Sequence, residues 1–255
     1  MNIILYMAVC RIYSLKSNEE KNQYIKDLFR ETYIKDILER NNIQNEKEVL
    51  ELLLDFTSSA IGSLTNPTKL SRRFLSEKQI NISSNTISRY LTYFEEAYVI
   101  YHANRYDLKG ARYFSTPLKY YFADIGLRNA RLNFRQVEET HIMENIIYND
   151  LLRRGYNIDV GVIEYDSKKD GNRRKVQLEV DFVINKGHKR YYIQSALNVD
   201  SIEKKEQETA SLKKIDDSFR KIVVVRNHII PRYDDNGILY IGVEEFLLDE
   251  AIIDL

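Results

Sequence analysis

Three acidic side chains and one amide in the second half of the chain have the types and spacing that catalysis could use. Glu144 lies in a segment with helical periodicity, Glu179 and Asp181 lie two apart in a strand-like segment, and Gln194 lies in the next such segment. Side chains two apart on a strand share a face. We therefore predict Glu179 and Asp181 as metal ligands, because carboxylate oxygens suit a divalent cation such as Mg²⁺. With Glu144, Asp181 and Gln194 as catalytic residues, a nuclease would use that ion to activate water and stabilise phosphate charge.

The same residues also have a structural interpretation. Glu179 would then be an ordinary exposed strand residue. Asp181 precedes the apolar run 182–184, where a carboxylate needs polar partners. Gln194 would hydrogen-bond to Asp181 or to the helix that carries Glu144. This interpretation, in which the residues are the relic of a site, is the one we favour from the sequence.

Strands that alternate with helices must position these side chains. The apolar periodicity predicts a helix over 142–153 that ends at Gly155, and helices over 202–214 and 244–248. It predicts strands over 161–165, 176–184, 191–197, 222–225 and 238–243. Strands interleaved with helices indicate an α/β (α+β) layer architecture.

The first half of the chain has the pattern of helices followed by a hairpin. Helices are predicted over 19–40 and 46–62, from the Asn66-Pro67 cap, and from Ser83 or Ser84 to about 94. Strands are then predicted over 98–102 and 119–122, with a turn between them at 108–111. The second strand ends at 124–127, and a polar linker follows over 129–140. Helices followed by a two-stranded hairpin form a winged helix.

The exposed face of the helix that begins near Ser84 could contact nucleic acid. We predict nucleic-acid binding by Asn85, Thr86 and Arg89 on this helix and by Lys109 and Arg112 on the wing. The alternative is that the hydroxyl residues only cap the helix, that nearby acidic residues dilute the positive charge, and that the module binds a protein.

Composition limits the classes of function. The 255 residues suffice for one or two domains, and 38 Lys and Arg balance 38 Asp and Glu, so nucleic-acid binding would need a local basic patch. The single cysteine, Cys10, excludes an internal disulfide and favours a reducing cytoplasm. The apolar run 3–9 is too short to span a membrane and lacks the features of a signal peptide. We expect it to form a buried strand or short helix, with Cys10 in the core.

Several segments, taken in order, carry a family resemblance. They include "SSNTISRYLTYFEEAYVIYHANRYD", "MENIIYNDLLRRGYNIDVG", "LEVDFVIN", "RYYIQSAL" and "GILYIGVEEFLLD". From about Lys21 to Leu255 the chain resembles the C-terminal region of prokaryotic AAA-type ATPases that carry a DUF4143 domain. The resemblance implies a helical remnant of the ATPase lid (1–45), a winged helix (46–130) and a PD-(D/E)xK, restriction-endonuclease-like α/β domain (138–255). It places Glu144, Asp181 and Gln194 on the acidic positions of that nuclease motif.

Two departures from the family pattern matter for function. No G-x-x-x-x-G-K-[ST] motif occurs, so we expect no ATP hydrolysis. The expected (D/E)-x-K is Gln194-Ser195-Ala196, which removes one carboxylate and the lysine. Losing one such electrostatic group costs on the order of 10²–10³ in rate. The alternative is that Lys186, Lys189 or Lys204 enters the site from elsewhere.

We therefore expect a nucleic-acid-binding or regulatory protein with a degenerate nuclease-like domain, without enzymatic activity and without a cofactor. DNA, an ATPase or another protein would be its partner, and a membrane would not. The first alternative is a DNA nuclease that depends on Mg²⁺ or Mn²⁺. The second is a protein-interaction partner of a separate ATPase.

Overall fold

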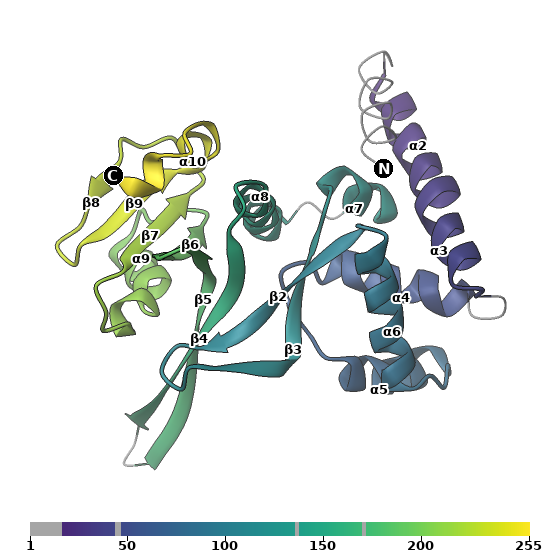
Figure 1. Cartoon of the computed structure of the whole chain (residues 1–255), viewed down its shortest axis with the longest axis horizontal. Helices are drawn as coiled ribbons and strands as arrows, with labels where there is room; N and C mark the ends of the chain where they lie inside the picture. Colours follow the sequence, from purple (N-terminus) through teal and green to yellow (C-terminus); the bar gives the residue numbers. More distant parts are fainter. Residues whose placement is uncertain (1–16, 44–46, 136–137, 170–171) are drawn as a thin grey trace. The chain divides into compact units, whose positions relative to one another are not determined.

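The computed structural model describes residues 17–43, 47–135, 138–169 and 172–255 (Figure 1). The chain divides into two compact units, one formed by the residues up to 101 with 122–137, the other by 102–121 with 138–255. The hairpin that we expected in the winged helix therefore has most of its residues in the second unit. The predicted element over 3–9 and the core position of Cys10 lie outside the described residues.

The first unit is mainly helical. Ser17 caps its first helix with a capping box, Asn66 caps the helix that begins at Pro67, and Ser83 caps the next one. The predicted helix starts at Asn66-Pro67 and at Ser83 or Ser84 are thus confirmed. The elements of this unit are α2 (Asn18–Leu28), a π-helical turn (Phe29–Ile34), α3 (Lys35–Arg40), α4 (Lys47–Ser59), β1 (Leu64–Thr65), α5 (Pro67–Lys78), α6 (Ser84–Glu96) and α7 (Ile125–Arg131).

Helix α7 corrects the sequence analysis, which placed a strand end at 124–127 and a linker from 129. The Asp124 carboxylate accepts hydrogen bonds from the N–H groups of Gly126 and Leu127, which starts a helix instead. Arg128, whose side chain is fully buried, donates to the Ser58 carbonyl at 2.9 Å. Arg131 forms ion pairs with Glu51 and Asp55. These contacts attach α7 to α4 inside the first unit.

The second unit contains a mixed sheet with strand order β3-β2-β4-β5-β6-β7-β9-β8. Strand β4 is parallel to β2 and antiparallel to β5, β6 is antiparallel to β5 and parallel to β7, and β9 is parallel to β7. This arrangement confirms the predicted α+β class. The strands are β2 (Ile100–Asp107), β3 (Arg112–Phe122), β4 (Asn157–Lys169), β5 (Asn172–Lys186), β6 (Lys189–Ala196), β7 (Arg220–Val225), β8 (Arg232–Tyr233) and β9 (Ile238–Gly242).

Three helices pack on this sheet. Helix α8 (Glu139–Arg153) contacts β4, β5 and β6, α9 (Ile202–Thr209) contacts β6, and α10 (Val243–Leu248) contacts β7, β9 and α8. Short 3₁₀ turns at Leu212–Lys214 and Ile252–Asp254 complete the unit. The last four residues of β7 and all five residues of β9 are buried, which is typical of parallel strands inside a sheet. Over the described residues, no helix combines the length and apolar character needed to cross a membrane.

Candidate functional site

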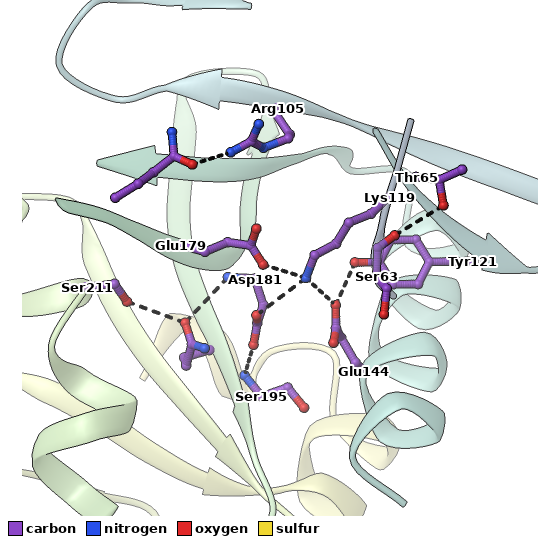
Figure 2. Close-up of polar contacts among 12 residues, drawn as sticks. Ser63, Thr65, Arg105, Lys119, Tyr121, Glu144, Glu179, Asp181, Ser195 and Ser211 are labelled. Atoms are coloured by element: carbon purple, nitrogen blue, oxygen red, sulfur yellow. Dashed lines mark hydrogen bonds and ion pairs between the residues drawn. The ribbon is translucent and has the colours of Figure 1, made fainter. Parts of the chain in front are cut away.

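The acidic residues that we predicted from the sequence come together in the second unit (Figure 2). Glu144 projects from the face of α8 that packs on the sheet, and Asp181 projects from β5; the two residues are only 6% and 8% exposed. Glu179 lies two residues before Asp181 on β5, and its side chain is 32% exposed. Helix and strand thus position three carboxyl groups at one place, as the spacing predicted.

The centre of this cluster is occupied by Lys119, which the sequence analysis did not include. Its ammonium nitrogen lies 2.6 Å from Glu179 Oε1, 3.0 Å from Glu144 Oε1 and 3.9 Å from Asp181 Oδ1. Lys119 comes from β3, and its side chain is only 6% exposed. A buried ammonium therefore holds the three carboxyl groups together. We call these four residues, Lys119, Glu144, Glu179 and Asp181, the lysine–carboxylate cluster.

A bulge in β5 sets the position of Asp181. Strand β4 pairs Gly161 with Val180 but Asp159 with Val183, so two residues of β5 lie opposite Val160. Such a bulge changes the direction of the side chains beside it. Asp181 Oδ2 accepts a hydrogen bond from the Ser195 N–H at 2.8 Å, and the Asp181 N–H donates to Gln194 Oε1 at 3.4 Å. Gln194 thus contacts the backbone of Asp181, as the structural interpretation expected.

The phenol of Tyr121 is the second functional group that the sequence analysis missed. It donates to Glu144 Oε1 at 2.7 Å, and its ring stacks on Tyr148 with centroids 4.2 Å apart. Burial, together with the Glu144 carboxylate, raises the pKa of Tyr121 well above its ordinary value. The phenol is therefore a neutral hydrogen-bond donor at physiological pH.

Burial and the neighbouring charges both shift the pKa values of Lys119 and Asp181 in this cluster. Burial by itself lowers the pKa of Lys119, but the carboxylates of Glu144, Asp181 and Glu179 outweigh it, so the pKa lies above its ordinary value and the ammonium stays charged. Burial and the neighbouring Glu144 raise the pKa of Asp181 to about 8, against the opposing effects of Lys119 and the Ser195 N–H. Asp181 therefore takes up a proton more readily than an ordinary aspartate.

This donor set does not fit the divalent cation that the nuclease resemblance implies. Mg²⁺ and Ca²⁺ bind oxygen ligands at about 2.0–2.6 Å, and they favour ionised carboxylates. Here the single ammonium of Lys119 already pairs with both Glu144 and Glu179, and the raised pKa of Asp181 disfavours its ionised form. Within the ranges that the structure describes, Asp, Glu, His and Cys side chains form no group of three or more that could hold a metal ion.

None of the three lysines proposed as substitutes for the missing motif lysine reaches the cluster, so that alternative is wrong. Lys186 donates to the Arg154 carbonyl at 2.8 Å, and Lys189 pairs with Asp254 at 2.8 Å. Lys204 lies exposed on α9. The cation comes instead from β3, where Lys119 and Tyr121 lie two residues apart and share a strand face. That spacing, in a segment whose next residues Tyr120–Phe122 are buried, was the signal available in the sequence.

The predicted nucleic-acid residues of the first unit lie on α6. Asn85 and Arg89 are exposed, and Arg89 forms no ion pair with any residue that the structure describes; its guanidinium lies 5.9 Å from the Tyr90 ring centroid. The hydroxyl of Thr86 hydrogen-bonds with that of Ser83, which is the N-cap, at 3.0 Å. Asn85 and Arg89 are thus the residues of this group whose side chains are free to contact a ligand.

The other two predicted nucleic-acid residues, Lys109 and Arg112, belong to the second unit. Both are exposed, at the turn between β2 and β3. The Arg112 guanidinium lies 3.3 Å from Asp107 Oδ2 and 5.8 Å from the Phe114 ring centroid. Asp107 therefore offsets part of the charge of Arg112, whereas Lys109 forms no ion pair within the described ranges.

Comparison with known proteins identifies both halves of the chain. The model for the domain of unknown function DUF8612 matches residues 10–138, and the model for the domain of unknown function DUF4143 matches residues 139–246. The chain is 32% identical over 228 residues to an uncharacterized protein of Haemophilus influenzae, which covers 89% of the chain and 52% of that protein. It is 28% identical over 225 residues to the uncharacterized protein MJ1544 of Methanocaldococcus jannaschii, which covers 88% of the chain and 47% of that protein. The chain thus spans about half the length of these relatives. No solved structure matches it.

Proposed function

Since this chain belongs to the family of the domain of unknown function DUF8612 and carries a DUF4143 domain, we propose that it is a nucleic-acid-binding or regulatory protein. Its nuclease-like centre serves structure rather than catalysis. The observation that carries this proposal is the position of Lys119 among Glu144, Glu179 and Asp181. An internal cation satisfies the carboxylates that would otherwise have to bind a catalytic ion.

The chemistry of the cluster supports a structural role in two further ways. A neutral amide, Gln194, stands at the third acidic position and is engaged with the Asp181 N–H and the Ser211 hydroxyl. Ala196, at the lysine position of the motif, is 1% exposed and packs in the hydrophobic core. A buried ion pair whose partners are all satisfied resists rearrangement, because each charge would lose its compensation.

The order of the elements and the family match also bear on the winged helix and on the origin of the chain. We propose that α4, α5 and α6, followed by β2 and β3, correspond to a winged helix. We also propose that the chain derives from the C-terminal region of an AAA-type ATPase, with residues 1–45 as the lid remnant. The order of the elements along the chain supports the first idea, and the DUF4143 match supports the second.

Arg89 provides the test of nucleic-acid binding. If α6 contacts a DNA backbone, Arg89→Ala should weaken duplex binding on the order of tenfold and lower the slope of log K against log[salt] by about one, since one phosphate contact is lost. Fluorescence anisotropy of a labelled duplex across a salt series measures both quantities. Arg232→Ala is the matched control, because Arg232 is also exposed but lies on β8 in the other unit.

Either of two results would contradict this part of the proposal. The wild-type chain could fail to bind duplex DNA at low salt, which would favour a protein partner instead. Arg89→Ala could also bind with the same affinity and salt slope as Arg232→Ala, which would remove α6 from the interface.

A metal-dependent nuclease is the second candidate function. The observation that favours it is again Lys119, because its ammonium stands beside Asp181 and Glu144 although Ala196 has replaced the motif lysine. Cleavage of DNA with Mn²⁺ that disappears in Asp181→Ala would support this candidate. It is weaker because Lys119 is bonded to the carboxylates that would have to hold the ion.

A further inference from the structure

The hairpin formed by β4 and β5 is longer than the strands beside it. The paired residues of β4 and β5 continue from Glu164–Gln177 to Lys169–Asn172. Strand β2 pairs with β4 only up to Val162, and β6 pairs with β5 only from Phe182 onward. Residues 164–169 and 172–177 therefore form a two-stranded ribbon without a neighbouring strand on either side among the described residues. We call this the β4–β5 ribbon, and Figure 1 shows it reaching past the other strands.

The ribbon carries a local excess of positive charge. Between positions 164 and 177 the sequence has five basic residues, Lys168, Lys169, Arg173, Arg174 and Lys175, against three acidic residues, Glu164, Asp166 and Asp170, whereas the whole chain has a net charge of zero. A local excess of positive charge attracts an anionic partner to this part of the chain.

The described basic side chains of the ribbon are available for contact. Arg174 and Lys175 are both exposed, and neither forms an ion pair with a residue that the structure describes. At the base of the ribbon, the Lys214 ammonium lies 5.1 Å from the centroid of the Tyr165 ring. This exposed lysine, on the 3₁₀ turn after α9, adds a further positive charge beside the ribbon.

We propose that the β4–β5 ribbon is an arm that binds double-stranded DNA by lying in its major groove. The major groove of B-form DNA, about 12 Å wide, admits a two-stranded ribbon, and the phosphates on both sides carry the complementary charge. Six residue pairs at roughly 3.3 Å per residue give the arm a reach of about 20 Å. The deep, narrow major groove of double-stranded RNA would exclude it. The inference rests on the proposed nucleic-acid binding and adds a second contact surface and a duplex substrate.

Charge reversal on the ribbon gives the first test. The double variant Arg174→Glu with Lys175→Glu should bind a labelled 25-base-pair DNA duplex at least tenfold more weakly than the wild-type chain. Its slope of log K against log[salt] should fall by about two, since each lost phosphate contact contributes about 0.9. The matched control is Lys204→Glu with Arg232→Glu, which changes the net charge equally on α9 and β8 and should cause a much smaller loss.

A shortened ribbon provides a test without added negative charge. Tyr165 and Val176 are paired in the register, so joining them through Asn-Gly replaces residues 166–175 with a two-residue hairpin turn and keeps the strand alignment. This variant should keep the wild-type circular dichroism spectrum and Arg89-dependent binding but lose the ribbon's part of the affinity. A single strand of the same length should bind the wild-type chain more weakly than the duplex.

The outcomes separate the ribbon from the proposed function. If Arg89→Ala weakens duplex binding while both ribbon variants match the control, the ribbon is not an arm and the proposed function stands. If the ribbon variants weaken binding while Arg89→Ala does not, the arm stands and α6 is not a contact. No duplex binding by the wild-type chain would overturn both. Equal affinity for single strand and duplex would overturn the groove assignment.

Discussion

Replacement of Lys119 with methionine is expected to lower the free energy of unfolding by about 3–5 kcal/mol at neutral pH, because it removes one partner of a buried charge cluster. Methionine has a similar length, so packing around the site is largely kept. Glu144, whose carboxylate accepts from both Lys119 and Tyr121, loses its cationic partner while it is 6% exposed. Urea unfolding followed by circular dichroism measures the effect.

Lys204→Met is the matched control for this variant, because it makes the same change at an exposed lysine on α9 and should leave the unfolding midpoint almost unchanged. The carboxylates uncovered in Lys119→Met should also bind Mn²⁺. A free Mn²⁺ concentration one hundred times its dissociation constant would restore about 2.7 kcal/mol of unfolding free energy to the variant by mass action. The wild-type chain should gain no stability from Mn²⁺. Equal stability of Lys119→Met and Lys204→Met would show that the cluster does not depend on the lysine.

Asp181→Asn should change how stability depends on pH. The pKa of Asp181 is about 8 in the folded chain, raised chiefly by burial, against an ordinary value of 3.8. Between these values the folded state holds a proton that the unfolded chain has released. The free energy of unfolding therefore falls as pH rises from about 4 to about 8, by up to roughly 1.4 kcal/mol per pH unit from this group. Asparagine cannot ionise, so the variant should gain stability relative to wild type across this range.

Urea unfolding of both proteins at pH 5, 6, 7 and 8 measures this difference. Asp254→Asn is the control with the opposite electrostatics, because hydrogen bonds from Lys189 and Tyr191 lower the pKa of Asp254. Asp254 takes up its proton only below about pH 4. The difference in unfolding free energy between Asp254→Asn and the wild-type chain should therefore stay constant from pH 5 to 8. A constant difference for Asp181→Asn as well would mean that Asp181 is ionised throughout, and that the cluster carries more negative charge than we infer.

Much of this fold follows from local signals in the sequence. Ser83 and Asn66-Pro67 correctly predicted where helices begin, because short polar side chains cap the free N–H groups of the first turn. The two-residue spacing of Glu179 and Asp181 placed both beside Lys119. Helix α7 was missed because the Asp124 cap follows directly on a strand, where the apolar pattern of Tyr120–Phe122 dominated the interpretation. The DUF4143 resemblance is confirmed, whereas the roles of Glu144, Asp181 and Gln194 in catalysis and of Glu179 in metal binding stay predictions.

The cation of the site could not be found by the same reasoning. A motif search looks for the lysine two residues after the third acidic position, where this chain has Ala196, or nearby in the chain. Lys119 comes from β3, 25 residues before Glu144, and reaches the carboxylates only through tertiary packing. The β5 bulge at Asp181 is likewise a property of how β4 and β5 pair, and its one local signal is Gly161, the strand glycine that pairs with Val180 beside it.

The most direct test of the central claim is to measure binding and cleavage in one sample, with a labelled DNA duplex, the wild-type chain and Mn²⁺ across a salt series. We predict anisotropy that rises with protein and falls steeply with salt, and a duplex that stays intact when the same sample is run on a denaturing gel. Mn²⁺-dependent cleavage that is abolished by Asp181→Ala would contradict the claim, since it would show that the carboxylates held by Lys119 serve catalysis.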